Sequence, residues 1–184
     1  EEQEHFVSLV TFNNDVKTIY ECVAVDDVKE LTEETYKPGC CTALYDAMGI
    51  SLSALRKKVA EEDKVLVTVV TDGYENASRE YNGKAIKALV DELKAKDWVF
   101  AYIGANQDAV EVAKGMNIGN AMNFHATHED TNRMWNDFRE STANYYEKVR
   151  MSKRRGERVF EDKEFFAKCN FADNAHQNRV TPER

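Results

Sequence analysis

Two polar side chains stand at positions where a parallel α/β sheet places groups that can do chemistry. Asp72 follows an apolar run, residues 65–70, that is rich in β-branched types and ends in the tripeptide Thr71-Asp72-Gly73. Such a run is typical of a strand buried on both faces, so its carboxyl end carries a carboxylate and a turn. Thr42 stands where the N-cap of a predicted helix belongs. Singly, the two residues are most simply a turn aspartate and a helix cap; together they pair a hydroxyl with a carboxylate.

Hydrophobic periodicity predicts the elements that position these two groups. Residues 6–12 and 16–25 are predicted strands, and the short Asn13-Asn14-Asp15 link between them favours an antiparallel hairpin. Further strands are predicted over residues 65–70, 98–103 and 121–124, and helices over residues 26–32, 42–62, 84–96, 107–116 and 127–155. The last helix opens with Thr127-His128-Glu129-Asp130, which resembles a capping box.

The alternation of strands and helices predicts the α/β class. We expect one doubly wound, mostly parallel sheet with the hairpin as its antiparallel edge and helices on both faces. Sheets of this kind bind ligands outside the carboxyl ends of their strands. Asp72 follows such an end, and the helix that begins at Thr42 starts at the same edge. The hydroxyl and the carboxylate are therefore expected to converge, supplied by two separate loops.

Length and charge limit the classes of function. The chain has 184 residues, 42% of them hydrophobic, which is enough for one sizeable core. We expect one domain over residues 1–155 and a polar extension over residues 156–184, either packed on the domain or partly disordered. The net charge of -8 repels a phosphate backbone, so nucleic-acid binding is not expected. The basic residues between positions 148 and 158 are interpreted as the solvated end of a helix, with an acidic partner or RNA as the alternative. The sequence contains no run of about 18 apolar residues, so no membrane span is predicted.

The cysteines and histidines show no metal-binding pattern. The spacing of the cysteines lacks Cys-x-x-Cys, and two of them are adjacent and could pair only through a strained ring. We interpret all four as free thiols in a reducing compartment, the cytoplasm. They are Cys22, Cys40, Cys41 and Cys169. His125 and His128 flank a helix start and are interpreted as exposed turn residues rather than zinc ligands.

The sequence around Thr42 and Asp72 resembles the von Willebrand factor A (vWA) family. The resemblance lies in the hairpin, in residues 39–47 (GCCTALYDA) and in the strand that ends at Asp72, and it extends over residues 6–155. Members of this family hold a divalent cation, usually Mg²⁺, between three loops. The resemblance implies that Thr42 is a hydroxyl ligand and that Asp72 holds a metal-bound water. It also implies protein–protein interaction, in some bacterial relatives as the substrate-recruiting partner of a ring ATPase.

One part of the family pattern is missing. The Asp-x-Ser-x-Ser loop does not occur in this sequence, and the strand and helix that carry it would lie before Glu1. Mg²⁺ requires near-octahedral coordination by oxygens, so Thr42 and Asp72 alone offer too few ligands and the site is incomplete. In the family's strand order the missing strand lies between the strands over 6–12 and 65–70, which leaves two bare edges. We expect a truncated piece of a longer family member, or a partner chain or rearranged sheet that fills the gap; the bare edges also allow self-association.

The leading functional hypothesis is a protein-binding module that recognises acidic groups through a divalent cation and is not an enzyme. The first alternative is a metal-dependent hydrolase for phosphate or acyl substrates, with Asp72 as ligand or base. Neither a Gly-x-x-x-x-Gly-Lys phosphate loop nor a Gly-x-Ser-x-Gly elbow supports it. The second alternative is a structural subunit with a vestigial cation site.

Overall fold

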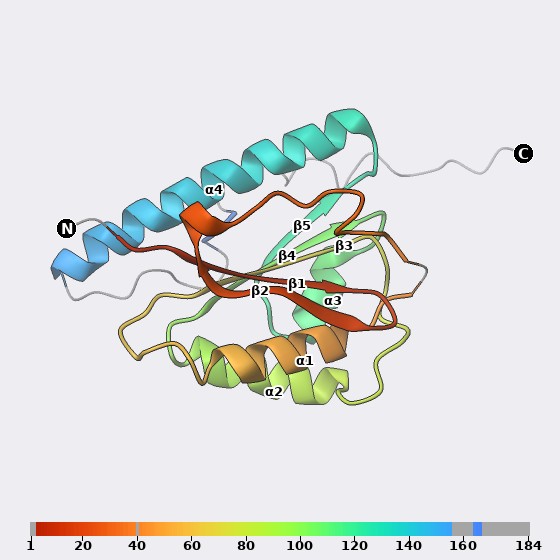
Figure 1. Cartoon of the computed structure of the whole chain (residues 1–184), viewed down its shortest axis with the longest axis horizontal. Helices are drawn as coiled ribbons and strands as arrows, with labels where there is room; N and C mark the ends of the chain where they lie inside the picture. Colours follow the sequence, from red (N-terminus) through yellow and green to blue (C-terminus); the bar gives the residue numbers. More distant parts are fainter. Residues whose placement is uncertain (1–2, 40, 156–163, 167–184) are drawn as a thin grey trace, which may run out of the picture.

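A parallel three-stranded sheet forms the centre of the protein (Figure 1). The computed structural model describes residues 3–39, 41–155 and 164–166. The strands are β3 (Leu66–Thr71), β4 (Val99–Ala105) and β5 (Asn120–Phe124), in the spatial order β3-β4-β5. Each connection runs through a helix, α2 (Gly83–Lys94) between the first two strands and α3 (Ala109–Gly115) between the last two. The predicted α/β class is confirmed.

Helices cover both faces of this sheet because the central strand is apolar on both sides. Every residue of β4 is buried. Its Phe100 and Tyr102 belong to the core shared with α1 (Leu44–Leu55), α2 and α3. Its Ala101 and Ile103 belong to a second core shared with α4 (His128–Arg155). Figure 1 shows α4 on one side of the sheet and α1 and α2 on the other.

The hairpin forms a sheet of its own. Strands β1 (Phe6–Phe12) and β2 (Val16–Ala24) pair antiparallel, as predicted, through the pair Phe12 and Val16 next to the turn. Among the described residues this ladder is not continuous with the one that begins at β3, so the hairpin is not an edge of the parallel sheet. Helix α1 contacts both β1 and β2, and its Leu44 and Met48 share one core with Tyr102 of β4, so the helix links the two sheets. The predicted gap for a further strand requires that β1 does not pair directly with β3. Among the described residues these two strands belong to separate sheets and do not pair.

Two predicted helix boundaries are wrong. The helix predicted over residues 26–32 is only a 3₁₀ turn, Val25–Asp27. Thr35 accepts the backbone N–H of Thr32 through its hydroxyl at 2.8 Å, a local side-chain bond of the kind that competes with helix. The helix predicted over residues 42–62 starts at Leu44 and ends at Leu55. The predicted helix was too long because Val59 continues the helical spacing of apolar residues. Val59 packs on the core, but it lies after the end of the helix.

One short part of the C-terminal extension packs on the domain. Phe165 and Phe166 are buried in the core under α4. The backbone N–H of Phe165 donates to Asn120 Oδ1 at 3.0 Å, and Lys148 Nζ pairs with Glu164 Oε2 at 3.0 Å. The rest of the extension predicted over 156–184 lies outside the described residues. Within the described part, none of the helices combines the length and the apolar character that crossing a membrane requires.

Candidate functional site

The hydroxyl of Thr42 lies directly against the turn that follows β3. A Cβ atom added to Gly73 would lie only 2.6 Å from Thr42 Oγ1. The turn itself is fixed by Thr71, whose Oγ1 donates to the Gly73 carbonyl at 3.1 Å and accepts the Gly73 N–H at 3.2 Å. Thr42 is buried, whereas Asp72 is exposed to solvent. The predicted approach of Thr42 to the loop of Asp72 is therefore present, with the carboxylate on the open side.

Thr42 does not cap α1. The N-cap residue is Ala43, whose side chain makes no capping hydrogen bond to the helix. The backbone of Thr42 instead pairs with Asn76, its N–H donating to Asn76 Oδ1 at 2.9 Å and its carbonyl accepting the Asn76 N–H at 3.0 Å. The N–H of Ala43 donates to the carbonyl of Asn13 in the hairpin turn at 2.7 Å. The N-cap prediction for Thr42 is wrong, because partners distant in sequence satisfy this part of the chain.

Glu75, the second acid near Asp72 in the sequence, supplies the cap. Its Oε2 accepts the backbone N–H of Tyr45 at 2.9 Å and the hydroxyl of Ser78 at 2.7 Å. Its Oε1 accepts the N–H groups of Ala77 at 3.0 Å and Ser78 at 2.8 Å. Burial raises the pKa of Glu75, but the bonds from Ser78, Tyr45 and Ala77 outweigh it and hold the pKa below its ordinary value. A carboxylate therefore stands at the positive end of α1.

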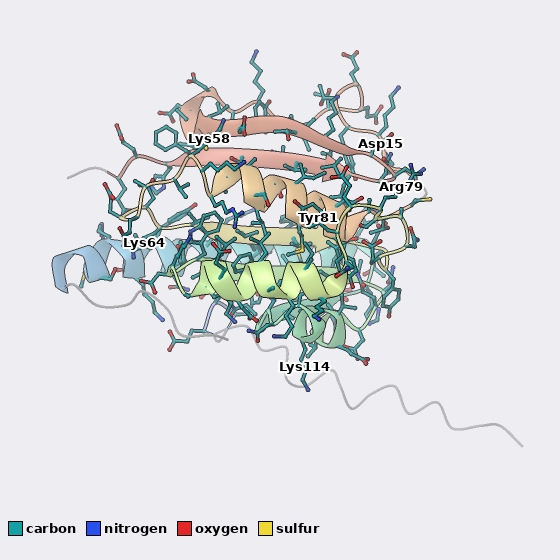
Figure 2. All side chains as sticks on the ribbon, turned by 90° about the horizontal axis from the view of Figure 1, so that it is seen from below. Asp15, Lys58, Lys64, Arg79, Tyr81 and Lys114 are labelled. Carbon is teal, nitrogen blue, oxygen red and sulfur yellow. The ribbon has the colours of Figure 1, made fainter. Side chains whose placement is uncertain are left out.

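Asp46 makes the reciprocal contact from α1 to the loop. Its Oδ2 accepts the backbone N–H of Arg79 at 2.7 Å, and its Oδ1 accepts those of Glu80 at 2.9 Å and Tyr81 at 2.8 Å. Burial raises the pKa of this carboxyl, but the three backbone donors and the charge of Arg79 bring it below its ordinary value. Figure 2 shows Arg79 and Tyr81 at the end of the molecule where α1 begins, with Lys58 and Lys64 toward the opposite end.

Tyrosines lie behind this edge of the sheet. Tyr102 of β4 is fully buried and faces Gln107, whose Nε2 donates to the carbonyl of Thr71 at 3.3 Å. Burial raises the pKa of Tyr102 to about 12, with smaller contributions from Tyr45 and Tyr74. The hydroxyl of Tyr74 accepts the backbone N–H of Asp108 at 3.2 Å. The loop after β3 is thus attached to the start of α3 as well as to that of α1.

The described residues do not complete a magnesium site. Both oxygens of Asp46 and of Glu75 already accept backbone N–H groups, so these carboxylates are not spare ligands. That leaves the Thr42 hydroxyl and the Asp72 carboxylate, fewer oxygens than octahedral Mg²⁺ requires. Within the described part of the chain, no three histidine, cysteine or acidic side chains cluster in a way that could hold a metal ion.

The remaining residues considered from sequence lie elsewhere. His125 and His128 are exposed at the start of α4, where Thr127 Oγ1 accepts the N–H of Asp130 at 3.2 Å as the predicted cap. Cys22 is a free thiol, and the side chains of Cys22 and Cys41 are both half-buried. Cys40 and Cys169 lie outside the described residues, as do the basic positions beyond 155.

The fold and the edge geometry define an α/β protein with a hydroxyl and an exposed carboxylate beside the carboxyl end of a parallel strand. A scan against protein-family models and searches of curated proteins and solved structures found no match. A fold of this class serves many functions, so the function is argued from the site.

Proposed function

We propose that this protein is a protein–protein interaction module whose binding face is the sheet edge at Thr42 and Asp72. The observation that carries the proposal is the approach of the Thr42 hydroxyl to Gly73 beside an exposed carboxylate. Loops at the carboxyl ends of parallel strands are where α/β folds bind ligands. Both loops here are attached to the scaffold by hydrogen bonds, which hold the backbone of this sheet edge in place.

The chemistry proposed for this face is recognition of an acidic side chain through a divalent cation. Thr42 and Asp72 supply two of its oxygens, and the remaining donors come from outside the described residues. A cation with an open position accepts a carboxylate oxygen without any bond chemistry. The resemblance to the vWA family supports this proposal, and the partner that it suggests is another protein, such as a ring ATPase.

Calorimetry tests the proposal. The full-length protein, with any chain that precedes Glu1, is titrated with Mn²⁺ or Mg²⁺ and then with an acidic peptide. We expect heat that EDTA removes and that Asp72→Asn abolishes. The matched control is Asp26→Asn, since Asp26 is exposed in the 3₁₀ turn that follows β2. No heat from wild type with either cation, or equal heat from both variants, would contradict the cation-dependent proposal.

The second candidate is a structural subunit that self-associates through strand edges. Two observations on β3 favour it. The side chain of Val70 is 40% exposed, and among the described residues β3 pairs only with β4. An unpaired strand edge offers backbone donors and acceptors to another chain. Sedimentation in EDTA tests it: assembly that persists without cation and is lost in Val70→Lys favours this candidate, and a monomer at all concentrations excludes it.

A further inference from the structure

The loop of residues 72–82, between β3 and α2, is bound to the first turn of α1 from both sides. We propose that Asp46, Glu75 and Ser78 form a reciprocal lock that positions Thr42 against the turn at Asp72. In this role the three are positioning residues, because they touch neither Thr42 nor Asp72 through any hydrogen bond of the described structure. The functional meaning of that position rests on the proposed function, whereas the lock itself does not.

The loop side of the lock is Glu75. The first N–H groups of a helix have no partner within the helix and need an acceptor from elsewhere. Ala43 supplies no side-chain acceptor, and Glu75 takes over this role at Tyr45. Because the same carboxylate also accepts the N–H groups of Ala77 and Ser78, it folds the loop around itself while it holds the helix.

The helix side of the lock is Asp46, one residue further along α1. It collects three successive N–H groups of the loop, those of residues 79–81, and its own N–H donates to Ser78 Oγ at 3.0 Å. Ser78 is therefore shared: its hydroxyl donates to Glu75 and accepts from Asp46. Charge-assisted bonds of this kind are stronger than neutral ones. Removal of the Glu75 carboxylate leaves donors without acceptors on both sides, the N–H of Tyr45 on the helix and those of Ala77 and Ser78 on the loop.

The position of Thr42 is set by its hydrogen bonds to the loop that the lock holds. It lies on the chain just before the locked turn, and both of its backbone groups bind Asn76, the neighbour of Glu75. Its hydroxyl lies beside Gly73, where an added Cβ would be 2.6 Å from Thr42 Oγ1. The position of Thr42 thus depends on residues about thirty positions away in sequence, and the local sequence of α1 alone does not specify it.

The test uses Glu75→Gln with Glu62→Gln as its matched control. Both oxygens of Glu75 receive an N–H, so an amide nitrogen in either place would face a donor. Glu62 is exposed in the connection between α1 and β3, and no contact of its side chain is found in the described structure. We expect the amides of Tyr45 and Ser78 to exchange with solvent about tenfold faster or more in Glu75→Gln, with the amides of β4 unchanged.

The position of Thr42 is measured separately, by the nuclear Overhauser effect between its γ-methyl and the α-protons of Gly73. The proposal expects this signal in wild type and in Glu62→Gln and its loss in Glu75→Gln. Equal exchange in the two variants overturns the lock. Faster exchange with the signal retained also overturns it, because Glu75 then caps the helix without positioning Thr42.

Two further arms keep the test decisive. If Glu75→Gln does not fold, Ser78→Ala removes only the shared hydroxyl. The amide to follow is then that of Asp46, which donates to this hydroxyl and should exchange faster, and the Thr42–Gly73 signal has the same two outcomes as above. Mn²⁺ is also added to wild type, where broadening of the Asp72 signals reports binding at the edge. Absence of that broadening counts against the cation-dependent function and leaves the lock standing, so the two failures are distinguishable.

Discussion

Gly73 is the residue that allows Thr42 to approach the sheet edge. A methyl group there would lie 2.6 Å from Thr42 Oγ1, closer than nonbonded atoms come. We predict that Gly73→Ala lowers the free energy of unfolding by about 1–3 kcal/mol through overpacking. Gly115→Ala is the matched control, since its added Cβ would meet nothing within 4 Å, and it should stabilise by up to about 1 kcal/mol. Urea unfolding measures both; equal effects of the two changes would contradict the close approach.

Tyr102 predicts how the protein responds to alkali. Its pKa is raised by burial to about 12 because the folded chain favours the neutral hydroxyl. The stability from this residue is complete below the unfolded pKa of about 10 and is lost as the pH rises through 12. Tyr102→Phe should therefore reduce the loss of unfolding free energy above pH 10, and Tyr36→Phe, which removes an exposed hydroxyl, should not. Identical alkaline profiles of the two variants would show that Tyr102 does not carry this dependence.

At the scale of elements, Asn120 joins β5 to its neighbours. This buried side chain donates to the Phe100 carbonyl at 2.9 Å and accepts the Phe165 N–H at 3.0 Å. Asn120→Ala leaves two buried backbone groups without partners, so we predict a loss of at least about 2 kcal/mol. Asn132→Ala, on the exposed face of α4, should change stability by less than about 0.5 kcal/mol. Chemical denaturation compares them; a small effect at Asn120 would mean that Phe165 is not docked there.

The elements themselves differ in how far local sequence specifies them. Strands β1, β3 and β5 lie within one residue of their predicted bounds. Runs rich in β-branched residues and a short turn signal account for β1 and β3, whereas β5 (NAMNF) contains no β-branched residue. The end of α1 was misplaced because Val59 continues the helical spacing of apolar residues after the helix has stopped. Periodicity reports which residues face the core, and a residue can do so from a turn.

At the scale of the whole molecule, the site was only half predictable. Thr42 and Asp72 stand next to a strand end and a helix start, which are local signals. Asp46 and Glu75 look like ordinary surface acids in sequence, since the bonds that join α1 to the loop connect residues 30 or more positions apart. The one available signal was their place in the sequence, Asp46 in the first turn of α1 close to Thr42 and Glu75 in the loop that contains Asp72. Tertiary hydrogen bonding, which no single-chain pattern encodes, decides their role.

These two acids also predict how the protein responds to low pH. The pKa of each lies below its ordinary value, 3.8 for Asp46 and 4.5 for Glu75, because the folded chain favours the charged form through hydrogen bonds. Their stabilising contribution is therefore present above those ordinary values and is lost as the pH falls through the lowered ones. Unfolding free energy measured from about pH 6 to about pH 2 should fall less steeply in Glu75→Gln than in the control Glu62→Gln. The variant should also be the less stable of the two at pH 6, and equal slopes would mean that Glu75 is not held in its charged form by the loop.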